Sequence, residues 1–287
     1  MPVWLTYTIE RFPPPVYLLV VGGFVLSGAA AAGAALAPIP IAWAGVGLLA
    51  FFFELRLMDE LKDFEKDKIA NPGRPLPRGL LSPELVRRAI GGIAAAMAVL
   101  GVVLVGAVTP SAGVLYLLLT AYLWLMYREF YIGTWLSDRP ILYAITHQVI
   151  LLPMVAFAAC CFVPEAWRLA PVWYMGMVSL GGFFAYEVCR KLDPLAHPVL
   201  KTYLSVYGPR GTVLLVFCAL VVAAIGAGLM GARAGIVLWP VEGLLAASLA
   251  ILLACPNRYK IVEGVASISL LAHLWGGAIC AWMGWKP

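Results

Sequence analysis

The sequence predicts an all-α integral membrane protein of about nine transmembrane helices in one bundle. Of the 287 residues, 63% are hydrophobic and only 12% are charged, and the mean hydropathy is +0.92. Soluble domains carry about a quarter charged residues. The longest polar stretch has roughly twenty residues, too few for a separate soluble domain of roughly 50. We therefore expect a single domain over residues 1–287, embedded in a lipid bilayer.

Nine apolar runs approach the roughly 20 residues that a spanning helix needs. Prolines mark the ends of several runs, and Ser82-Pro83-Glu84 supplies an N-cap, a proline at the first helical position and an acid in the first turn. Runs rich in glycine and alanine indicate close packing against other helices. The expected spans are 15–37, 40–58, 83–108, 111–128, 140–163, 171–190, 210–231, 236–254 and 263–285.

The basic residues predict the orientation in the membrane. If Arg11 and four polar loops lie on one side, that side holds all but three of the 20 Lys and Arg residues, the exceptions being Arg168, Arg233 and Lys286. Because basic residues concentrate in cytoplasmic loops, we expect the N-terminus in the cytoplasm and the C-terminus outside the inner (plasma) membrane. The N-terminus lacks the features of a cleaved signal peptide. The four loops are 59–82, 128–139, 190–210 and 255–263.

A charged segment, residues 54–68, directly follows the second apolar run and holds six of the fifteen acidic residues. We expect it to continue that run as a helix beyond the hydrocarbon. Asp59, Asp63 and Asp67 are spaced i, i+4 and i+8, so they share one helix face, with Glu60 beside them. Their mutual repulsion predicts a divalent cation with oxygen ligands. The competing interpretation is a solvated helix end neutralised by its own interleaved lysines.

A rigid basic loop follows the charged segment. Residues 71–79 read Asn-Pro-Gly-Arg-Pro-Leu-Pro-Arg-Gly, and these prolines and glycines exclude a regular helix. Arg74 and Arg78 carry planar donor groups suited to phosphate oxygens. Carboxylates for a metal, followed closely by arginines for phosphate, match what a diphosphate requires.

The block 59–79 resembles the UbiA superfamily of intramembrane prenyltransferases. The family's first acidic motif, N-D-x-x-D-x-x-x-D, reads Asp59-Glu60-x-x-Asp63-x-x-x-Asp67 here, with Asp in place of Asn. The family's R-P-L-x-x-G loop corresponds to residues 74–79. The nine expected spans, Arg11-Phe12-Pro13 and the stretch 201–208 are also similar to the family.

The second family motif, D-x-x-x-D, is altered here. In the segment 186–194, at the end of the sixth expected span, the only acids are Glu187 and Asp193, which are six residues apart and are followed by Pro194. Glu187 could hold a second metal ion, Pro194 could end the helix and turn Asp193 inward, and Arg190 and Lys191 could bind diphosphate directly. The alternative is a simple i, i+4 pair of Glu187 with Lys191. The E-x-x-R-K pattern resembles an uncharacterised bacterial branch of the superfamily.

The resemblance implies two Mg²⁺ ions that bridge the carboxylates to an isoprenoid diphosphate, whose ionisation gives an allylic cation. A lipophilic acceptor, aromatic or other, then takes the prenyl group. His147, inside a span, is expected to bond a neighbouring helix or to contact the acceptor. The implied metal ligands are Asp59, Glu60, Asp63, Asp67, Glu187 and Asp193, of which Asp59, Asp63, Asp67 and Glu187 are the catalytic set. The implied diphosphate ligands are Arg11, Arg74, Arg78, Arg139, Lys191 and Lys201. Aromatic side chains that could face the cation or anchor the interface are Tyr116, Tyr122, Trp124, Tyr127, Tyr143 and Tyr186.

Other functions explain these sequence features less well. A terpene cyclase on the same scaffold would share the ionisation chemistry without an acceptor. A transporter would place its acids near the membrane midplane, and a CDP-alcohol phosphotransferase would need a D-G-x-x-A-R signature, which the sequence lacks. A structural membrane protein would leave the acidic face unexplained. No basic-aromatic pattern indicates nucleic acid, and the six cysteines form no C-x-x-C pair.

Overall fold

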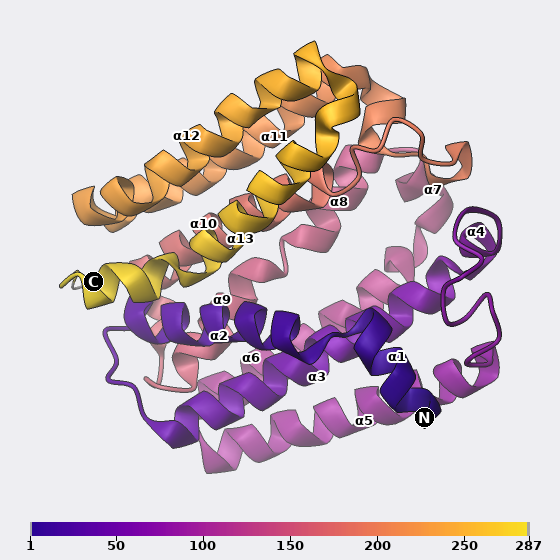
Figure 1. Ribbon diagram of the computed structural model, residues 1–287. Coiled ribbons are helices and arrows are strands. Elements are labelled where there is room, and N and C mark those ends of the chain that lie inside the picture. The colour runs from indigo at the N-terminus through magenta and orange to yellow at the C-terminus, as the bar shows by residue number, and fades with distance from the viewer. Residues whose placement is uncertain (1, 286–287) are drawn as a thin grey trace.

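The computed structural model describes residues 2–285, and every regular element within them is helical, which confirms the expected all-α class (Figure 1). Eight segments of this described part are long and apolar enough to cross a membrane. They are α2 (Pro14–Ala31), α3 (Pro38–Lys62), α5 (Pro83–Ala107), α6 (Pro110–Tyr127), the pair α8 (Pro140–Gln148) and α9 (Leu151–Cys160), α11 (Tyr203–Met230), α12 (Ala232–Ala254) and α13 (Tyr259–Trp282).

Helix α10 (Ala170–Cys189) fills the remaining expected span, 171–190, but is not among those eight. Its glycines, tyrosines and Glu187 lower its hydropathy, and the count of nine spans stays a prediction. The shorter elements are α1 (Val3–Arg11), α4 (Phe64–Ala70), α7 (Gly133–Ser137) and the 3-10 turns η1 (Glu129–Tyr131), η2 (Ala166–Arg168), η3 (Pro198–Leu200) and η4 (Pro256–Arg258).

Two expected spans differ from the helices for reasons of backbone chemistry. The first span was expected to reach residue 37, but α2 ends at Ala31 because Gly33 adopts a φ of +64°. The amides of Gly33 and Ala34 donate to the carbonyls of Ala30 and Ala29, at 3.0 and 2.9 Å, which is a Schellman motif. The span 140–163 is divided into α8 and α9 because Pro153 has no amide to donate to the carbonyl of Val149.

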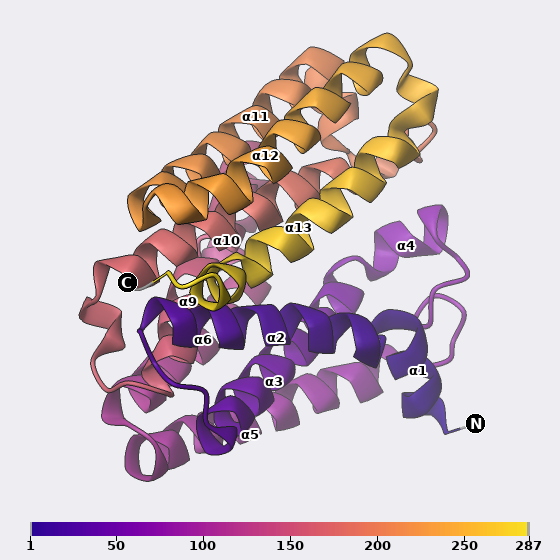
Figure 2. The same ribbon diagram turned by 60° about the vertical axis from the view of Figure 1, so that its left-hand side comes forward.

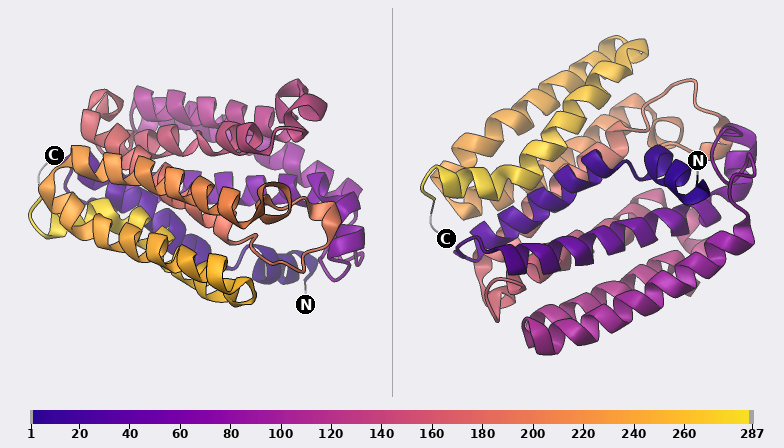
Figure 3. Two further views of the ribbon diagram at one scale, coloured as in Figure 1. Left: turned by 90° about the horizontal axis from the view of Figure 1, so that it is seen from above. Right: turned by 60° about the horizontal axis from the view of Figure 1, so that its bottom comes forward.

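The axes of the long helices are roughly aligned, and the helices pack side by side (Figure 3). One group contains α10 to α13 in chain order, and the other contains α2, α3, α5, α6 and α9. The groups meet where α9 packs on α10 and where α2 packs on α13 (Figure 2). In the second contact, the Ser27 hydroxyl donates to the Leu274 carbonyl at 2.6 Å and the Trp275 indole donates to the Leu19 carbonyl at 3.0 Å.

The two ends of the bundle differ. α1, α4 and α7 lie at one end together with the described start of the chain, and the described end of α13 lies at the other (Figure 1). We call the first of these the α4 end. Arg168 lies just before α10, and Arg233 lies in the first turn of α12. Both helices run toward the α4 end, so these two arginines lie at the opposite end, as expected. Lys286 lies outside the described residues. The sides of the bundle carry exposed apolar side chains such as Ile39, Val102 and Ile268, as a lipid-facing surface requires.

Candidate active site

The acidic motif lies where α3 ends. Helix α3 stops at Lys62, Asp63 forms a bend and α4 starts at Phe64, so the uninterrupted helix expected from 54 to 68 is not present. Hydrogen bonds from Asp63 N to Asp59 O, 2.9 Å, and from Asp67 N to Asp63 O, 2.8 Å, keep the helical spacing through the bend. The three aspartates follow one another as predicted, but their surroundings differ.

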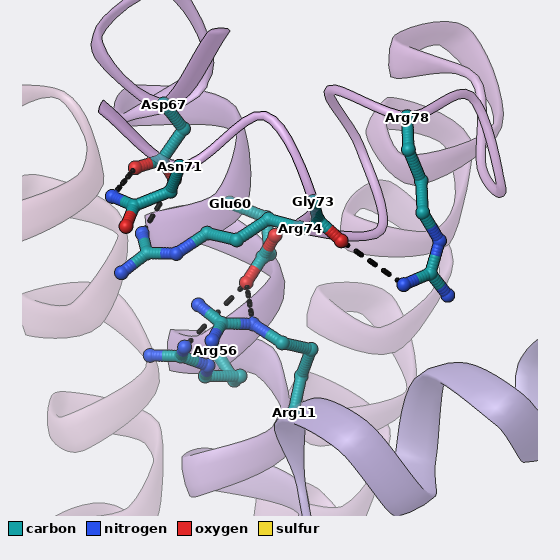
Figure 4. Close-up of polar contacts among 8 residues, drawn as sticks. All are labelled: Arg11, Arg56, Glu60, Asp67, Asn71, Gly73, Arg74 and Arg78. Atoms are coloured by element: carbon teal, nitrogen blue, oxygen red, sulfur yellow. Dashed lines mark hydrogen bonds and ion pairs between the residues drawn. The ribbon is translucent and has the colours of Figure 1, made fainter. Parts of the chain in front are cut away.

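Asp67 turns into the protein and pairs with the basic loop (Figure 4). Its side chain is only 2% exposed, Arg74 Nη1 lies 2.5 Å from one carboxylate oxygen, and Asn71 donates to the other at 2.9 Å. The proline-rich loop therefore folds back over α4. Asp67 was predicted to bind a metal ion and Arg74 a phosphate. In this structure the two side chains instead form an ion pair with each other.

Glu60 belongs to a second buried group (Figure 4). Arg11 Nε, from the end of α1, lies 2.5 Å from Glu60 Oε1, and Arg56, one turn earlier on α3, lies 3.5 Å from the same oxygen. The Glu60 side chain is 1% exposed. The hydroxyl of Tyr7 and Nε of Arg56 are buried beside this group without a hydrogen-bond partner in the described chain. Two arginines share one carboxylate, so the group has one surplus positive charge.

Asp59 and Asp63 are the unpaired members of the motif. Both are partly buried, and neither forms an ion pair within residues 2–285. The charges that act most strongly on Asp59 come from Arg56, Asp63, Lys62 and Arg190. Arg190, at the end of α10, is close enough for its charge to act on Asp59, so the two acidic motifs of the sequence both lie at the α4 end.

The second motif is also paired. Glu187 on α10 binds both Arg190, at 2.5 Å, and Lys191. This is the i, i+4 pair that was the alternative to a metal ligand, and it adds a second surplus positive charge. The carboxylate of Glu187 raises the pKa of Arg190. Asp193 does not turn inward: its carboxylate accepts the Leu195 amide at 2.9 Å in an Asx turn.

The remaining expected phosphate ligands lie at the surface of the α4 end. Arg78 donates to Glu10 at 2.8 Å, and this hydrogen bond lowers the pKa of Glu10. Arg139 packs over the Trp135 ring at 4.3 Å and donates to the carbonyl of that residue. Lys201 is exposed, with a φ of +43°. Among described contacts, none of these three cations reaches the acidic motif.

Tyr143 is the aromatic side chain most closely tied to the acids. Its hydroxyl accepts from Lys62 Nζ at 2.8 Å, and Lys62 also lies 3.5 Å from Glu129. The ring stacks on His147 at 4.0 Å. The Nδ1 atom of His147 lies 2.8 Å from the Tyr143 carbonyl, so this atom bonds within its own helix. The other expected aromatics divide among the core, helix contacts and the surface: Tyr116 and Tyr122 donate to backbone carbonyls, Trp124 packs on Tyr127, and Tyr186 is half-buried on α10.

Sequence reasoning missed three residues near this site or on its helix. Arg56 lies one turn before Glu60, and its i, i+4 spacing could have identified it. Tyr17 on α2 is placed among the charges of Arg56 and Asp59 by tertiary packing, for which no sequence signal exists. Glu54, earlier on α3, lines a separate cavity between α3, α5 and α6.

The donor set fits one Mg²⁺ ion. Within residues 2–285 no three Asp, Glu, His or Cys side chains are gathered in a metal-binding arrangement. Mg²⁺, however, is commonly held by one or two carboxylates together with substrate phosphates and water. Asp59 and Asp63 lie on successive helical turns, and their carboxylates are free to act as hard-oxygen ligands. The other three acids, Glu60, Asp67 and Glu187, already form ion pairs with arginines.

Fold and site together define a helical membrane bundle with a charged mouth at one end. Among solved structures, the chain is similar to a UbiA homologue from Aeropyrum pernix K1 in its apo form, with 16% identity, a TM-score of 0.66, and coverage of 94% of this chain and 98% of the other. It is also similar to a digeranylgeranylglyceryl phosphate synthase in membranes, with 14% identity, a TM-score of 0.64, and coverage of 96% and 99%. No protein-family model and no curated protein matches. The expected UbiA-type membrane fold is thus confirmed.

Proposed function

We propose that this protein is an intramembrane prenyltransferase that, with Mg²⁺, ionises an isoprenoid diphosphate and transfers its prenyl group to an aromatic or other lipophilic acceptor. The observation that carries the proposal is the unpaired Asp59–Asp63 carboxylate pair in a UbiA-type fold, set between two ion-pair groups that each have a surplus cation. The α4 end would face the cytoplasm of the plasma membrane, as the basic loops predict.

The charges at the α4 end suit a diphosphate. Asp59 and Asp63 would hold the metal ion, which when bound neutralises oxygens of the leaving group. The surplus charge of the Arg11–Arg56–Glu60 group and that of the Glu187–Arg190–Lys191 group would then attract the remaining negative charge of the diphosphate. Arg56 Nε, which is buried without a partner in the described chain, is a free donor for one phosphate oxygen.

The hydrocarbon part of the substrate would enter the bilayer side of this mouth. Tyr17 and Tyr143 are partly buried near Asp59, and their rings could face an allylic cation while excluding water. Lys62, which precedes Asp63 in the chain, is held by Tyr143 and Glu129 and would be available to the diphosphate as a further donor.

The test is incubation of the purified protein with Mg²⁺ and prenyl diphosphates of increasing length, with and without aromatic acceptors, followed by mass analysis. We expect Asp63→Asn to lower turnover about 100-fold or more, because a neutral amide is a poor ligand for a hard cation. Asp138→Asn, which changes an exposed aspartate directly after α7, is the matched control and should keep full activity.

The same experiment separates the alternatives. Full activity of a folded Asp63→Asn variant would contradict the metal assignment. A hydrocarbon product formed without any acceptor would identify a terpene cyclase on this scaffold. Failure of every diphosphate to react or bind would contradict both enzymes and favour a different role, such as transport.

A further inference from the structure

A buried acid lies apart from the diphosphate site. Glu54 is on α3, eight residues before its end at Lys62, or roughly 12 Å along the helix axis at 1.5 Å per residue. It is only 1% exposed, and neither carboxyl oxygen has a hydrogen-bond partner in the described chain. Glu54 lies five positions before Asp59. At 3.6 residues per turn, the two side chains therefore point roughly 140° apart around the helix axis.

Glu54 lines a cavity of about 480 Å³ between α3, α5 and α6. The walls are apolar apart from Glu54 and Thr120, and the small side chains of Ala94 and Ala98 leave the space open. Trp124, 40% exposed, stands at its edge, so the cavity opens on the lipid-facing side of the bundle. The volume and the predominance of apolar lining are those of a small-molecule site, which typically occupies about 300–1,000 Å³.

The carboxyl group of Glu54 is available to hydrogen-bond a ligand. No cation pairs with Glu54 among residues 2–285, and a charged carboxylate at this depth in hydrocarbon is costly, so the acid is held in its uncharged form. Such a group donates one hydrogen bond and accepts others. The Thr120 hydroxyl donates to the Tyr116 carbonyl at 2.9 Å, which leaves its lone pairs free to accept.

We propose that this cavity is a second binding site, which takes from the bilayer an uncharged lipid with a hydroxyl head and an isoprenoid or acyl chain. The hydroxyl would accept from the Glu54 acid and donate to Thr120 or to the Glu54 carbonyl oxygen. The chain would lie between α5 and α6 along Ala94, Ala98 and Leu117. A hydroxyl fits better than an amine because, besides Glu54, only Thr120 among the lining side chains could accept from the several N–H groups of an ammonium group.

Photo-crosslinking tests the proposal on the full chain in lipid nanodiscs. The probe is a long-chain alcohol with a diazirine near its head, compared with its methyl ether and with the corresponding amine. We expect the alcohol to label α3, α5 or α6 about fivefold more than the ether, which is the ratio produced by loss of one hydrogen bond. An isoprenoid alcohol and a saturated alcohol, used as separate probes, distinguish the two chain types.

Two variants locate the site. Glu54→Leu should reduce labelling by the alcohol to the level of the ether, and Ala98→Trp should abolish labelling by filling the cavity. Ile268→Trp places the same indole side chain at an exposed position of α13 and should leave labelling unchanged. Binding of an isoprenoid diphosphate at the α4 end, measured separately, reports whether each variant is folded.

The outcomes are decisive in either direction. Equal labelling by alcohol and ether, or no labelling of α3, α5 or α6, would overturn the proposal, and stronger labelling by the amine would overturn the uncharged head. If Glu54→Leu does not fold, dicyclohexylcarbodiimide is applied to the unaltered protein. The Glu54 acid adds to the carbodiimide and the adduct rearranges to a stable N-acylurea, with no group lost. The alcohol should block this reaction, and the ether should not. Equal reaction in both would contradict the site.

Discussion

Neighbouring carboxylates at the end of α3 have different partners although they lie within about two helical turns of one another. Glu60 accepts from Arg11, 49 residues away in the sequence, and Asp67 accepts from Arg74 in the following loop. Asp59 and Asp63 have neither partner. The sequence could identify the acidic cluster, but it could not assign the pairs, because these depend on how α1 and the loop 71–79 fold over α3.

Glu60→Gln should destabilise the fold. The substitution removes the charge that two partly buried arginines share, and breaking such a buried pair costs about 3 kcal/mol. Thermal unfolding in detergent measures the effect. Glu65→Gln removes an exposed pair with Lys68 and should change the stability by less than about 0.5 kcal/mol. Equal stability of the two variants would contradict the structural role of Glu60.

At the scale of the helices, hydrophobic pattern and proline positions predict most boundaries. α5 was expected at 83–108 and runs from Pro83 to Ala107, with the Ser82 side chain accepting the Leu85 amide as an N-cap. α11 was expected from residue 210 and begins at Tyr203, because Gly208, with a φ of +67°, accommodates a kink ahead of Pro209. Such kinks depend on tertiary contacts, so the periodic pattern does not reveal them.

Glycines set the distance between α5 and α6. A Cβ atom at Gly113 would lie 2.4 Å from the Val105 backbone nitrogen and 2.7 Å from the Gly101 carbonyl oxygen, and neither backbone atom can move freely. Gly113→Ala should therefore lower the free energy of unfolding by about 2 kcal/mol. Gly92→Ala, with open space around the added carbon, should leave stability unchanged or raise it by about 0.5 kcal/mol. Detergent unfolding of both variants checks the contrast, and an equally tolerated Gly113→Ala would refute it.

For the whole molecule, charge and topology agree. The described chain starts at the α4 end and finishes at the other, which requires an odd number of crossings and is consistent with the nine expected from the sequence (Figure 1). The basic loops gather at the α4 end, where the carboxylate site also lies. This arrangement follows from the sequence alone, since each apolar run reverses the direction of the chain.

Cysteine labelling tests the orientation. In a background without the exposed Cys218 and Cys255, we expect a membrane-impermeant maleimide to label Arg168→Cys in intact cells. The same reagent should reach Lys66→Cys, on α4, only after the cells are permeabilised. The reverse pattern would place the α4 end outside the cell.

The contact of α2 with α13 has a consequence for the synthesis of this protein. Ser27, Gly22 and Gly23 of α2 have their partners, Leu274 and Trp275, in α13, and Leu274 follows Ser27 by 247 residues. Until α13 is synthesised, this part of α2 lacks these partners, whereas Gly28 can already pack on Ala158 of α9. The contact between α2 and α13 therefore joins the two helix groups only after all the helices between them have been synthesised.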